Sequence, residues 1–197
     1  CTTATAAEAD QPLDEVLTIG TRADIDNITG SAHLVDAAEL DKFEYADIQR
    51  ISRSIPGVSI QVEDGYGLRP NISIRGVATE RSGRITLLED NVLIAPAPYS
   101  APSAYYFPTA GRMQAFEVVK GPAAITQGPY TIGGALNMVS TAIPAEAGGK
   151  VMLEYGQDST ARLLAQYGDT QANGFGYLFE VQQWQSDGFQ TVDNSES

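Results

Sequence analysis

The segment Glu117–Ser140, EVVKGPAAITQGPYTIGGALNMVS, constrains the fold more than any other part of the 197-residue chain. It sets two apolar runs on either side of a cluster of Gly and Pro. Gly permits backbone conformations and close approaches that other residues disfavour, while Pro interrupts helices and central strands. Such a cluster either cradles a phosphate group or makes a tight, irregular crossing between two strands.

The phosphate interpretation fails on the residues that follow the glycines. A phosphate-binding loop needs its second Gly to be followed by Lys and then Ser or Thr, and neither Gly121 nor Gly128 meets this requirement. The dinucleotide fingerprint also fails, because GYGLRP has Pro70 where a third Gly must pack a helix on a strand. The cluster is therefore interpreted as structural.

Composition excludes several other classes of function. The net charge of −13 argues against nucleic acid as a partner. Because Cys1 is the single cysteine, no internal disulfide or thiolate zinc site is expected, and we interpret it as a residue near a processing boundary. His33 lies in a polar and apolar alternation, which favours a solvated or strand-edge side chain. With one His and no internal Cys, no Ser-His-Asp or Cys-His arrangement can form, so an enzyme is not expected.

No run of the sequence approaches the roughly 20 apolar residues that a membrane helix requires, although alternating membrane strands stay possible. The first thirteen residues are small, polar and without periodicity, which predicts a disordered lead-in. The next segment, Asp14–Arg22 (DEVLTIGTR), is extended, apolar and too short to bury itself. It is either a first strand or a segment that pairs with the sheet edge of another protein.

The middle of the chain is predicted to form a compact α+β unit of short strands and two short helices. The helical patterns are DAAELDKF and ADIQRISRSIPGV, and the second places Ile48, Ile51 and Ile55 on one face. Pro56 and Gly57 end that helix, and EDN at residues 89–91 predicts a tight hairpin turn. Strands are expected in VSIQVED, NISIRGV, RITLLEDNVLI, MQAFEVVKG and ALNMVST.

After Pro144 the pattern changes to alternating segments of about ten residues, GKVMLEYGQ, TARLLAQYGD and GFGYLFEVQQWQSDGF. Two faces are predicted for these strands. Apolar side chains alternate with polar or charged ones, and both a soluble antiparallel sheet and a membrane barrel fit this pattern. One face is expected to hold Val151, Leu153, Tyr155, Ala161, Leu163, Ala165 and Tyr167, and the other Lys150, Glu154, Arg162 and Gln166.

Four of these segments, in order, resemble the N-terminal part of TonB-dependent outer-membrane receptors, most of all the ferric-citrate type: NISIRGV, TLLEDNVLIAPAP, YYFP and RMQAFEVVKGPAAITQGPYTIGGALNMVS. The resemblance covers nearly the whole chain from Asp14. It implies a flexible periplasmic N-terminus at 1–30, a plug domain at 31–144, and the first three antiparallel strands of a 22-stranded transmembrane β-barrel at 145–197. The chain would then be the opening part of a longer protein, with the Gly and Pro cluster forming close crossings near the barrel wall.

The resemblance also assigns roles to residues at both ends of the plug. DEVLTI lies where the family carries the TonB box, the peptide on which the energy-transducing protein TonB pulls. Arg75 of the IRG motif and Lys120 before GP resemble the basic pair that joins barrel glutamates in a charge cluster. Family members commonly have Arg at the position of Lys120. Lys120 would therefore supply a compact ammonium charge in place of a planar guanidinium group. The TonB box would comprise Asp14, Glu15, Val16, Leu17, Thr18 and Ile19.

Three loops, EDGYGLRPN, ATERSGR and APYSAPSAYYF, would lie on the end that the family directs outward. Guanidinium and phenol groups there would form charge-assisted hydrogen bonds with an anionic ferric chelate. Iron would be carried by the chelator, so no cofactor and no protein-bound metal are expected. The candidate ligand-binding residues are Arg69, Arg81, Arg84, Tyr66, Tyr99, Tyr105 and Tyr106.

The expected function is TonB-dependent import of a ferric siderophore, ferric citrate or a related carboxylate chelate, across the outer membrane of a Gram-negative bacterium. The implied partners are TonB with its inner-membrane complex, the ferric siderophore and outer-membrane lipid, and the N-terminus would lie in the periplasm. Two alternatives stay open. One is a receptor for vitamin B12, haem or an oligosaccharide, and the other is a soluble periplasmic binding module.

Overall fold

The computed structural model describes Ile19 and residues 22–43, 48–62, 68–94 and 106–188. The chain divides into two compact units, one within Leu13–Thr141 and the other containing Ala142–Ser197. The first unit has the α+β architecture that the sequence predicts, and the second is a three-stranded antiparallel sheet. Within the described residues, no helix is long and apolar enough to cross a membrane.

A five-stranded sheet in the order β1-β6-β7-β4-β5 forms the centre of the first unit. All neighbours are antiparallel except β4 and β7, which are parallel. The two apolar runs that flank the Gly and Pro cluster are β6 and β7, which pair in the middle of the sheet. The strands span Ser31–Val35 (β1), Ile85–Glu89 (β4), Val92–Leu93 (β5), Met113–Lys120 (β6) and Gly134–Ser140 (β7).

β1 was not among the strands expected from the sequence. It is short, and among the described strands it lies at the edge of the sheet and pairs with β6 alone. His33 lies in this strand and is half-buried, which agrees with the strand-edge position that the sequence favours.

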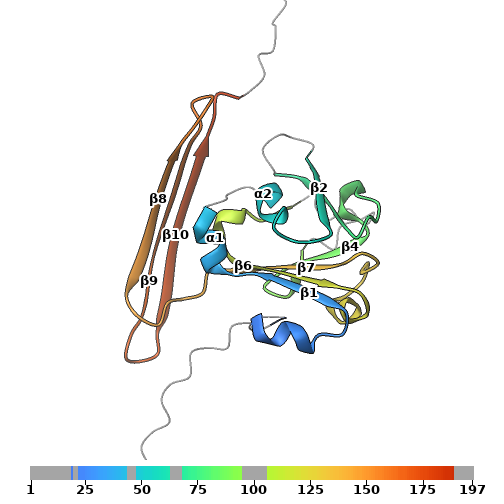
Figure 1. Cartoon of the computed structure of the whole chain (residues 1–197). Coiled ribbons are helices and arrows are strands. Elements are labelled where there is room, and N and C mark those ends of the chain that lie inside the picture. The colour runs from blue at the N-terminus through green and yellow to red at the C-terminus, as the bar shows by residue number, and fades with distance from the viewer. Residues whose placement is uncertain (1–18, 20–21, 44–47, 63–67, 95–105, 189–197) are drawn as a thin grey trace, which may run out of the picture. The chain divides into compact units, whose positions relative to one another are not determined.

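Two helices and a separate hairpin cover one face of the sheet (Figure 1). The helices α1 and α2 span Ala37–Phe43 and Ile48–Ser52, and the hairpin pairs β2, Val58–Val62, with β3, Pro70–Ile74. Asp36 caps α1, because its Oδ1 accepts a hydrogen bond of 2.9 Å from the Glu39 amide.

The core on this face is formed by the helical stripe and the strands together. The predicted stripe of Ile48, Ile51 and Ile55 is buried, as expected from its spacing. It packs in one cluster with Ile74 of the hairpin and Phe116 of β6. The helices therefore depend on tertiary packing, because helices of this length are not stable alone.

The opposite face of the sheet is covered by short 3-10 helices, η1 at Arg22–Asn27 and η6 at Pro122–Gln127. The side chains of Ile19, Ile25 and Ile28 pack there in a second apolar cluster. The extended segment expected to run to Arg22 is therefore too long, because Arg22 already belongs to η1. Local turn geometry replaces the extended conformation because it lets Ile25 and Ile28 pack against the sheet.

The Gly and Pro cluster forms a close crossing, as interpreted from the sequence. At Gly134, φ is +143° and an added Cβ would lie 2.5 Å from the Val119 carbonyl oxygen. At Gly133, an added Cβ would lie 2.8 Å from the Val77 side chain. Only glycine fits these two positions, and the close neighbours belong to strands and loops of the same unit.

The second unit is a sheet in the order β10-β9-β8 with regular antiparallel register. The predicted division into two faces is confirmed, because Leu153 lies opposite Leu163 while Glu154 lies opposite Arg162. On the apolar face, Val151, Leu153 and Tyr155 are 70, 77 and 80% exposed. The strands span Gly148–Tyr155 (β8), Ala161–Thr170 (β9) and Gly176–Gln185 (β10).

Each face of this sheet has its own cross-strand contacts. On the polar face, Arg162 Nη1 lies 3.1 Å from Glu154 Oε2, and Gln166 Nε2 donates to Glu180 Oε2 at 2.6 Å. On the apolar face, the Tyr177 ring centroid lies 6.4 Å from that of Tyr167. The rings of Phe175 and Phe179 lie 6.3 and 5.5 Å from Tyr177, which forms an aromatic cluster beside the β9–β10 turn.

Candidate functional site

The three predicted ligand-binding arginines are all exposed and belong to neighbouring segments. Arg69 directly precedes β3, Arg81 lies in the short 3-10 helix η2 at Glu80–Ser82, and Arg84 directly precedes β4. The contacts between η2 and the first half of β3 hold the first two of these segments together. Arg84 follows two residues after η2, so the three arginines lie on segments that are joined to one another or adjacent in sequence.

Two buried polar side chains hold η2 in place. The Ser82 hydroxyl donates to the Pro70 carbonyl at 3.1 Å and accepts from the Ile72 amide at 2.9 Å. The Asn71 Oδ1 accepts from the Arg81 amide at 2.7 Å. Both side chains are almost fully buried, so the turn that presents Arg81 is fixed from inside the unit.

The backbone of this turn is strained. Arg81 and Ser82 have φ values of +50° and +57°, a region that residues other than Gly rarely occupy. Two consecutive residues of this kind persist only where the surroundings over-determine them, and such strain concentrates at functional sites. The sequence did not point to Asn71 or Ser82, although a polar residue inside the apolar NISI strand was an available indication.

Of the four predicted ligand-binding tyrosines, Tyr66, Tyr99 and Tyr105 lie outside the described residues. Tyr106 is exposed, and its hydroxyl donates to Glu89 Oε2 at 2.9 Å. Burial of the hydroxyl and then the neighbouring Glu89 raise the pKa of Tyr106 above its usual value of 10.0. Arg112 Nη2 lies 3.4 Å from the other oxygen of Glu89, so Tyr106 belongs to a three-residue polar group at the end of β4.

The predicted pair of cations, Arg75 and Lys120, is brought together. Arg75 is exposed directly after β3, whereas Lys120 is almost fully buried at the end of β6 and donates to the Pro56 carbonyl. Burial and then the Arg75 charge lower the pKa of Lys120 from 10.5. Among the described residues, no carboxylate is paired with either cation, so two like charges share one region of the unit.

The predicted TonB box is described at one residue only. Asp14, Glu15, Val16, Leu17 and Thr18 lie outside the described residues. The Ile19 side chain is 3% exposed, and its amide donates to Glu117 Oε1 at 2.8 Å. The end of this segment is therefore fastened to the sheet.

Glu117 and Asn137 are buried polar residues that the sequence interpretation missed. They lie opposite each other on β6 and β7, and Asn137 Nδ2 donates to Glu117 Oε2 at 2.7 Å. An indication was present, since each is a polar residue inside an apolar run, AFEVV and ALNMV. Their pairing could not be predicted, because neither run alone specifies the register between the two strands.

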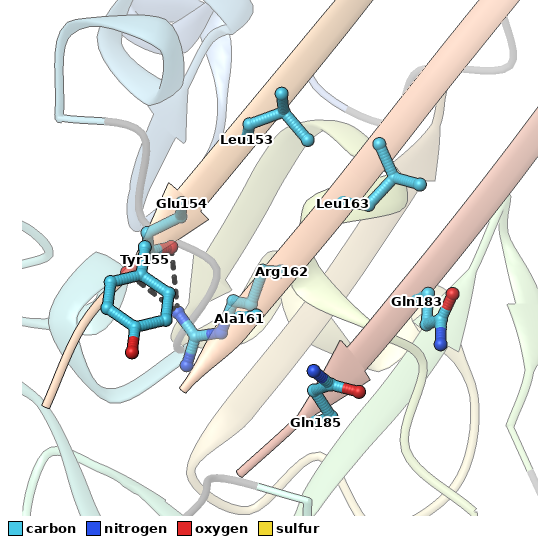
Figure 2. Close-up of a pocket in the computed structure, with 8 residues that line it drawn as sticks. All are labelled: Leu153, Glu154, Tyr155, Ala161, Arg162, Leu163, Gln183 and Gln185. Atoms are coloured by element: carbon cyan, nitrogen blue, oxygen red, sulfur yellow. Dashed lines mark hydrogen bonds and ion pairs between the residues drawn. The ribbon is translucent and has the colours of Figure 1, made fainter. Parts of the chain in front are cut away.

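A shallow hollow of about 360 Å³ lies in the second unit, at the end of the sheet near the β8–β9 connection (Figure 2). Most of its lining comes from the apolar face, with Leu153, Tyr155 and Leu163 next to Gln183 and Gln185. The hollow is formed by the surface of one three-stranded sheet and contains none of the predicted ligand-binding residues. We therefore do not assign it as the ligand site. Among the described residues, no group of three His, Cys, Asp or Glu side chains is placed to hold a metal ion.

The chain thus consists of an α+β unit followed by an amphipathic three-stranded sheet. Residues 24–135 match the sequence profile of the TonB-dependent Receptor Plug Domain. The chain therefore belongs to this family, whose members are receptors and transporters.

Curated relatives include two proteins called vitamin B12 transporter BtuB. The one from Photobacterium profundum is 27% identical over 152 residues, which cover 77% of this chain and 24% of the relative. The one from Vibrio vulnificus (strain CMCP6) is 25% identical over 177 residues, covering 90% of this chain and 26% of the relative. The chain thus spans about a quarter of the length of these relatives.

Solved structures with the same fold include the ferric citrate transporter FecA in its unliganded form. Its TM-score is 0.72 at 24% identity, over 89% of this chain and 28% of that one. The siderophore receptor PirA from Acinetobacter baumannii gives a TM-score of 0.60 at 22% identity, over 78% of this chain and 24% of that one. The predicted fold, an α+β plug followed by antiparallel strands, is confirmed.

Proposed function

We propose that the chain is the N-terminal part of a TonB-dependent receptor that imports a ferric siderophore, ferric citrate or a related carboxylate chelate. The receptor would lie in the outer membrane of a Gram-negative bacterium, with its N-terminus in the periplasm. In this proposal, residues 1–30 carry the TonB box, 31–144 form the plug, and 145–197 begin the barrel. TonB, the ferric chelate and outer-membrane lipid are the partners, and the iron arrives as cargo inside its chelator.

The second unit supports the membrane assignment. Its apolar face is exposed along all three strands, its other face carries cross-strand polar pairs, and aromatic rings gather beside one turn. Membrane barrels have such an apolar outer face, polar interior and interfacial aromatic rings. A soluble sheet with one uncovered apolar face would be prone to association.

The observation that carries the ligand class is the set of arginines at Arg69, Arg81 and Arg84, with Arg81 on a strained and internally fixed turn. Guanidinium groups form charge-assisted hydrogen bonds with carboxylates, and a backbone turn that is already fixed loses little further conformational freedom on binding. An anionic chelate therefore fits this face better than a neutral ligand.

Charge reversal tests the ligand class in the full-length receptor. Arg81→Glu with Arg84→Glu replaces two cations by two anions, and we expect affinity for ferric citrate to fall at least about 100-fold. The matched control is Lys42→Glu with Arg53→Glu, which makes the same net change at exposed positions near the ends of α1 and α2, outside the three loops. Equal affinity in both double variants would move the ligand site away from these arginines.

Vitamin B12 import is the second candidate, and the sequence identity to proteins named vitamin B12 transporter favours it. The same variants separate the two candidates, because a largely uncharged cobalamin should respond weakly to charge reversal. Equilibrium binding of ferric citrate and of cyanocobalamin is measured for each variant. Tight cobalamin binding that the Arg81 and Arg84 changes leave intact would favour this second candidate.

Energy coupling is tested at the proposed TonB box. If Asp14–Ile19 adds as a strand to a sheet of TonB, pairing requires backbone amides and an extended shape. Leu17→Pro removes one donor and restricts its neighbour, so ligand binding should persist while uptake is lost. Leu17→Ala removes side-chain contacts only and should slow uptake. Normal uptake by the Leu17→Pro receptor would withdraw the TonB-box assignment.

A further inference from the structure

A fully buried carboxylate lies at the centre of the plug sheet. Glu117 occupies the middle of β6, between Leu34 of β1 and Asn137 of β7. Its side chain is on the face that also carries Val119 and Ala135, the face covered by η1. Because a buried charge is costly without hydrogen-bond donors, the groups that donate to Glu117 are expected to be held tightly.

One of these donors comes from the N-terminal segment. The Ile19 amide donates to Glu117 Oε1 at 2.8 Å, across 98 positions in the sequence. The Ile19 side chain also inserts into the apolar cluster formed with Leu88, Val119 and Ala135. Residue 19 therefore has two separate anchors, an apolar side chain and a charge-assisted backbone hydrogen bond.

The other carboxylate oxygen connects to the β4–β5 turn. Asn137 Nδ2 donates to Glu117 Oε2 at 2.7 Å, and Asn137 Oδ1 accepts from the Asn91 amide at 2.9 Å. The turn also holds β7 directly, because Asp90 accepts from the Ser140 amide and hydroxyl at 2.9 and 2.7 Å. A continuous line of hydrogen bonds thus runs from the turn to Ile19.

The same turn adjoins one of the candidate ligand-binding residues. Glu89 is the last residue of β4 and accepts from the Tyr106 hydroxyl. Asp90 and Asn91 follow it, both with positive φ, which fixes the turn in a single tight geometry. A shift of Glu89 would therefore move the Asn91 amide that supports Asn137.

We propose that Glu117 is the positioning residue that holds the N-terminal segment on the plug at Ile19, and that Asn137 and Asn91 link this hold to the Glu89–Asn91 turn. The inference rests on the proposed function for the meaning of the segment as a TonB box. The two states are Ile19 docked in its apolar cluster and Ile19 released. Displacement of the turn weakens the support of Glu117 and favours release.

The donor and acceptor pattern allows a sharp substitution test. In Glu117→Gln, one side-chain oxygen becomes an NH₂ group, which must face either the Ile19 amide or the Asn137 amide group, both of which are donors. The double variant adds Asn137→Asp. The new glutamine on β6 can then accept from the Ile19 amide and donate to the new aspartate on β7, which in turn accepts from the Asn91 amide. The exchange restores these three hydrogen bonds and moves the negative charge by one strand.

Amide hydrogen exchange of the full-length, ligand-free receptor in detergent provides the readout. We expect amide exchange at Ile19 to accelerate at least about tenfold in Glu117→Gln. Loss of a hydrogen bond to a charged group shifts the opening equilibrium by about that factor or more. The double variant should return exchange to near the wild-type rate. Glu80→Gln, a change of an exposed glutamate in the same unit, serves as the matched control and should have no effect.

Unchanged exchange at Ile19 in Glu117→Gln would overturn the inference. Equal acceleration at Ile19 and at Leu87 in the core, or a double variant as fast as the single one, would also overturn it by indicating loss of packing alone. The transport proposal fails separately. If the receptor imports no ligand but amide exchange at Ile19 responds as expected, the role of Glu117 in holding Ile19 stands and the assignment of the segment as a TonB box fails.

Discussion

The two units of the chain use apolar residues in opposite ways. The plug buries its apolar side chains on both faces of one sheet, and Phe116, Leu87 and Ile74 have no exposed surface. The three-stranded sheet leaves its apolar face uncovered, with Leu153 exposed by 77%. The plug thus covers most of its apolar side chains by itself, whereas the three-stranded sheet leaves a row of apolar side chains exposed.

The largest expected effect comes from removing the second unit. A chain ending at Pro144 should be monomeric in detergent-free buffer, whereas the 197-residue chain should self-associate. The reason is the uncovered apolar face together with the outer edges of β8 and β10 in the described sheet. Size-exclusion chromatography with light scattering measures both chains. Equal monodispersity would break the comparison and favour a soluble binding module.

Matched truncations of large side chains test the comparison inside each unit. Phe116→Ala in the plug core should lower the free energy of unfolding by about 4 kcal/mol, since it leaves a cavity. Leu153→Ala on the uncovered face should change it by less than about 0.5 kcal/mol when the 197-residue chain is kept monomeric in mild detergent. Urea-dependent exchange of amides in β6 and in β9 reports each unit separately. Similar losses at both positions would mean that Leu153 is covered in solution.

Two glycines with positive φ extend the comparison to the backbone. Gly134→Ala should cost about 3 kcal/mol, because the added Cβ would lie 2.5 Å from the Val119 carbonyl as well as adopting an unfavourable φ. Gly174 lies in the β9–β10 turn with φ of +83°, and no atom lies within 4 Å of the Cβ that Gly174→Ala would add. Its cost should be about 1 kcal/mol, from the conformation alone. Thermal unfolding compares the two, and equal costs would remove close approach as the reason for Gly134.

The smallest expected effect concerns charge within the plug. Because burial and Arg75 lower the pKa of Lys120 in the folded state, folding disfavours its protonated form. Stability of the chain ending at Pro144 should therefore rise as pH increases from the lowered pKa toward 10.5. The free energy of unfolding is measured against pH for the wild type and for Lys120→Met. The difference between the two profiles separates the contribution of Lys120 from that of the tyrosines. Parallel profiles would indicate that a carboxylate already neutralises the pair.

The sequence predicted the features that depend on local periodicity. The stripe at Ile48, Ile51 and Ile55 and the two faces of β8 and β9 follow from spacing, and the turn at 89–91 follows from its residue types. It did not predict β1, which is too short to stand out, nor the 3-10 conformation of Arg22.

Features that depend on contacts distant in sequence were also missed. The parallel pairing of β4 with β7 sets Leu88 beside Asn137, and nothing local to either strand specifies this neighbour. For the same reason, the candidate arginines could be named while the Asn71 and Ser82 contacts that fix Arg81 could not. The roles of Arg69, Arg81, Arg84, Arg75 and Lys120 stay predictions.

The edge position of β1 has a mechanical consequence for the proposed transport cycle. Tension applied through the N-terminal segment would pass Ile19 and η1 and reach β1 at Ser31, whose partner across the ladder is Lys120. Because β1 has a neighbour on one side only among the described strands, its pairs can open one after another from that end, which needs less force than breaking them together. The first pair to part would bring Lys120 and its neighbour Arg75 under load, so the charged pair would respond before the central strands are strained.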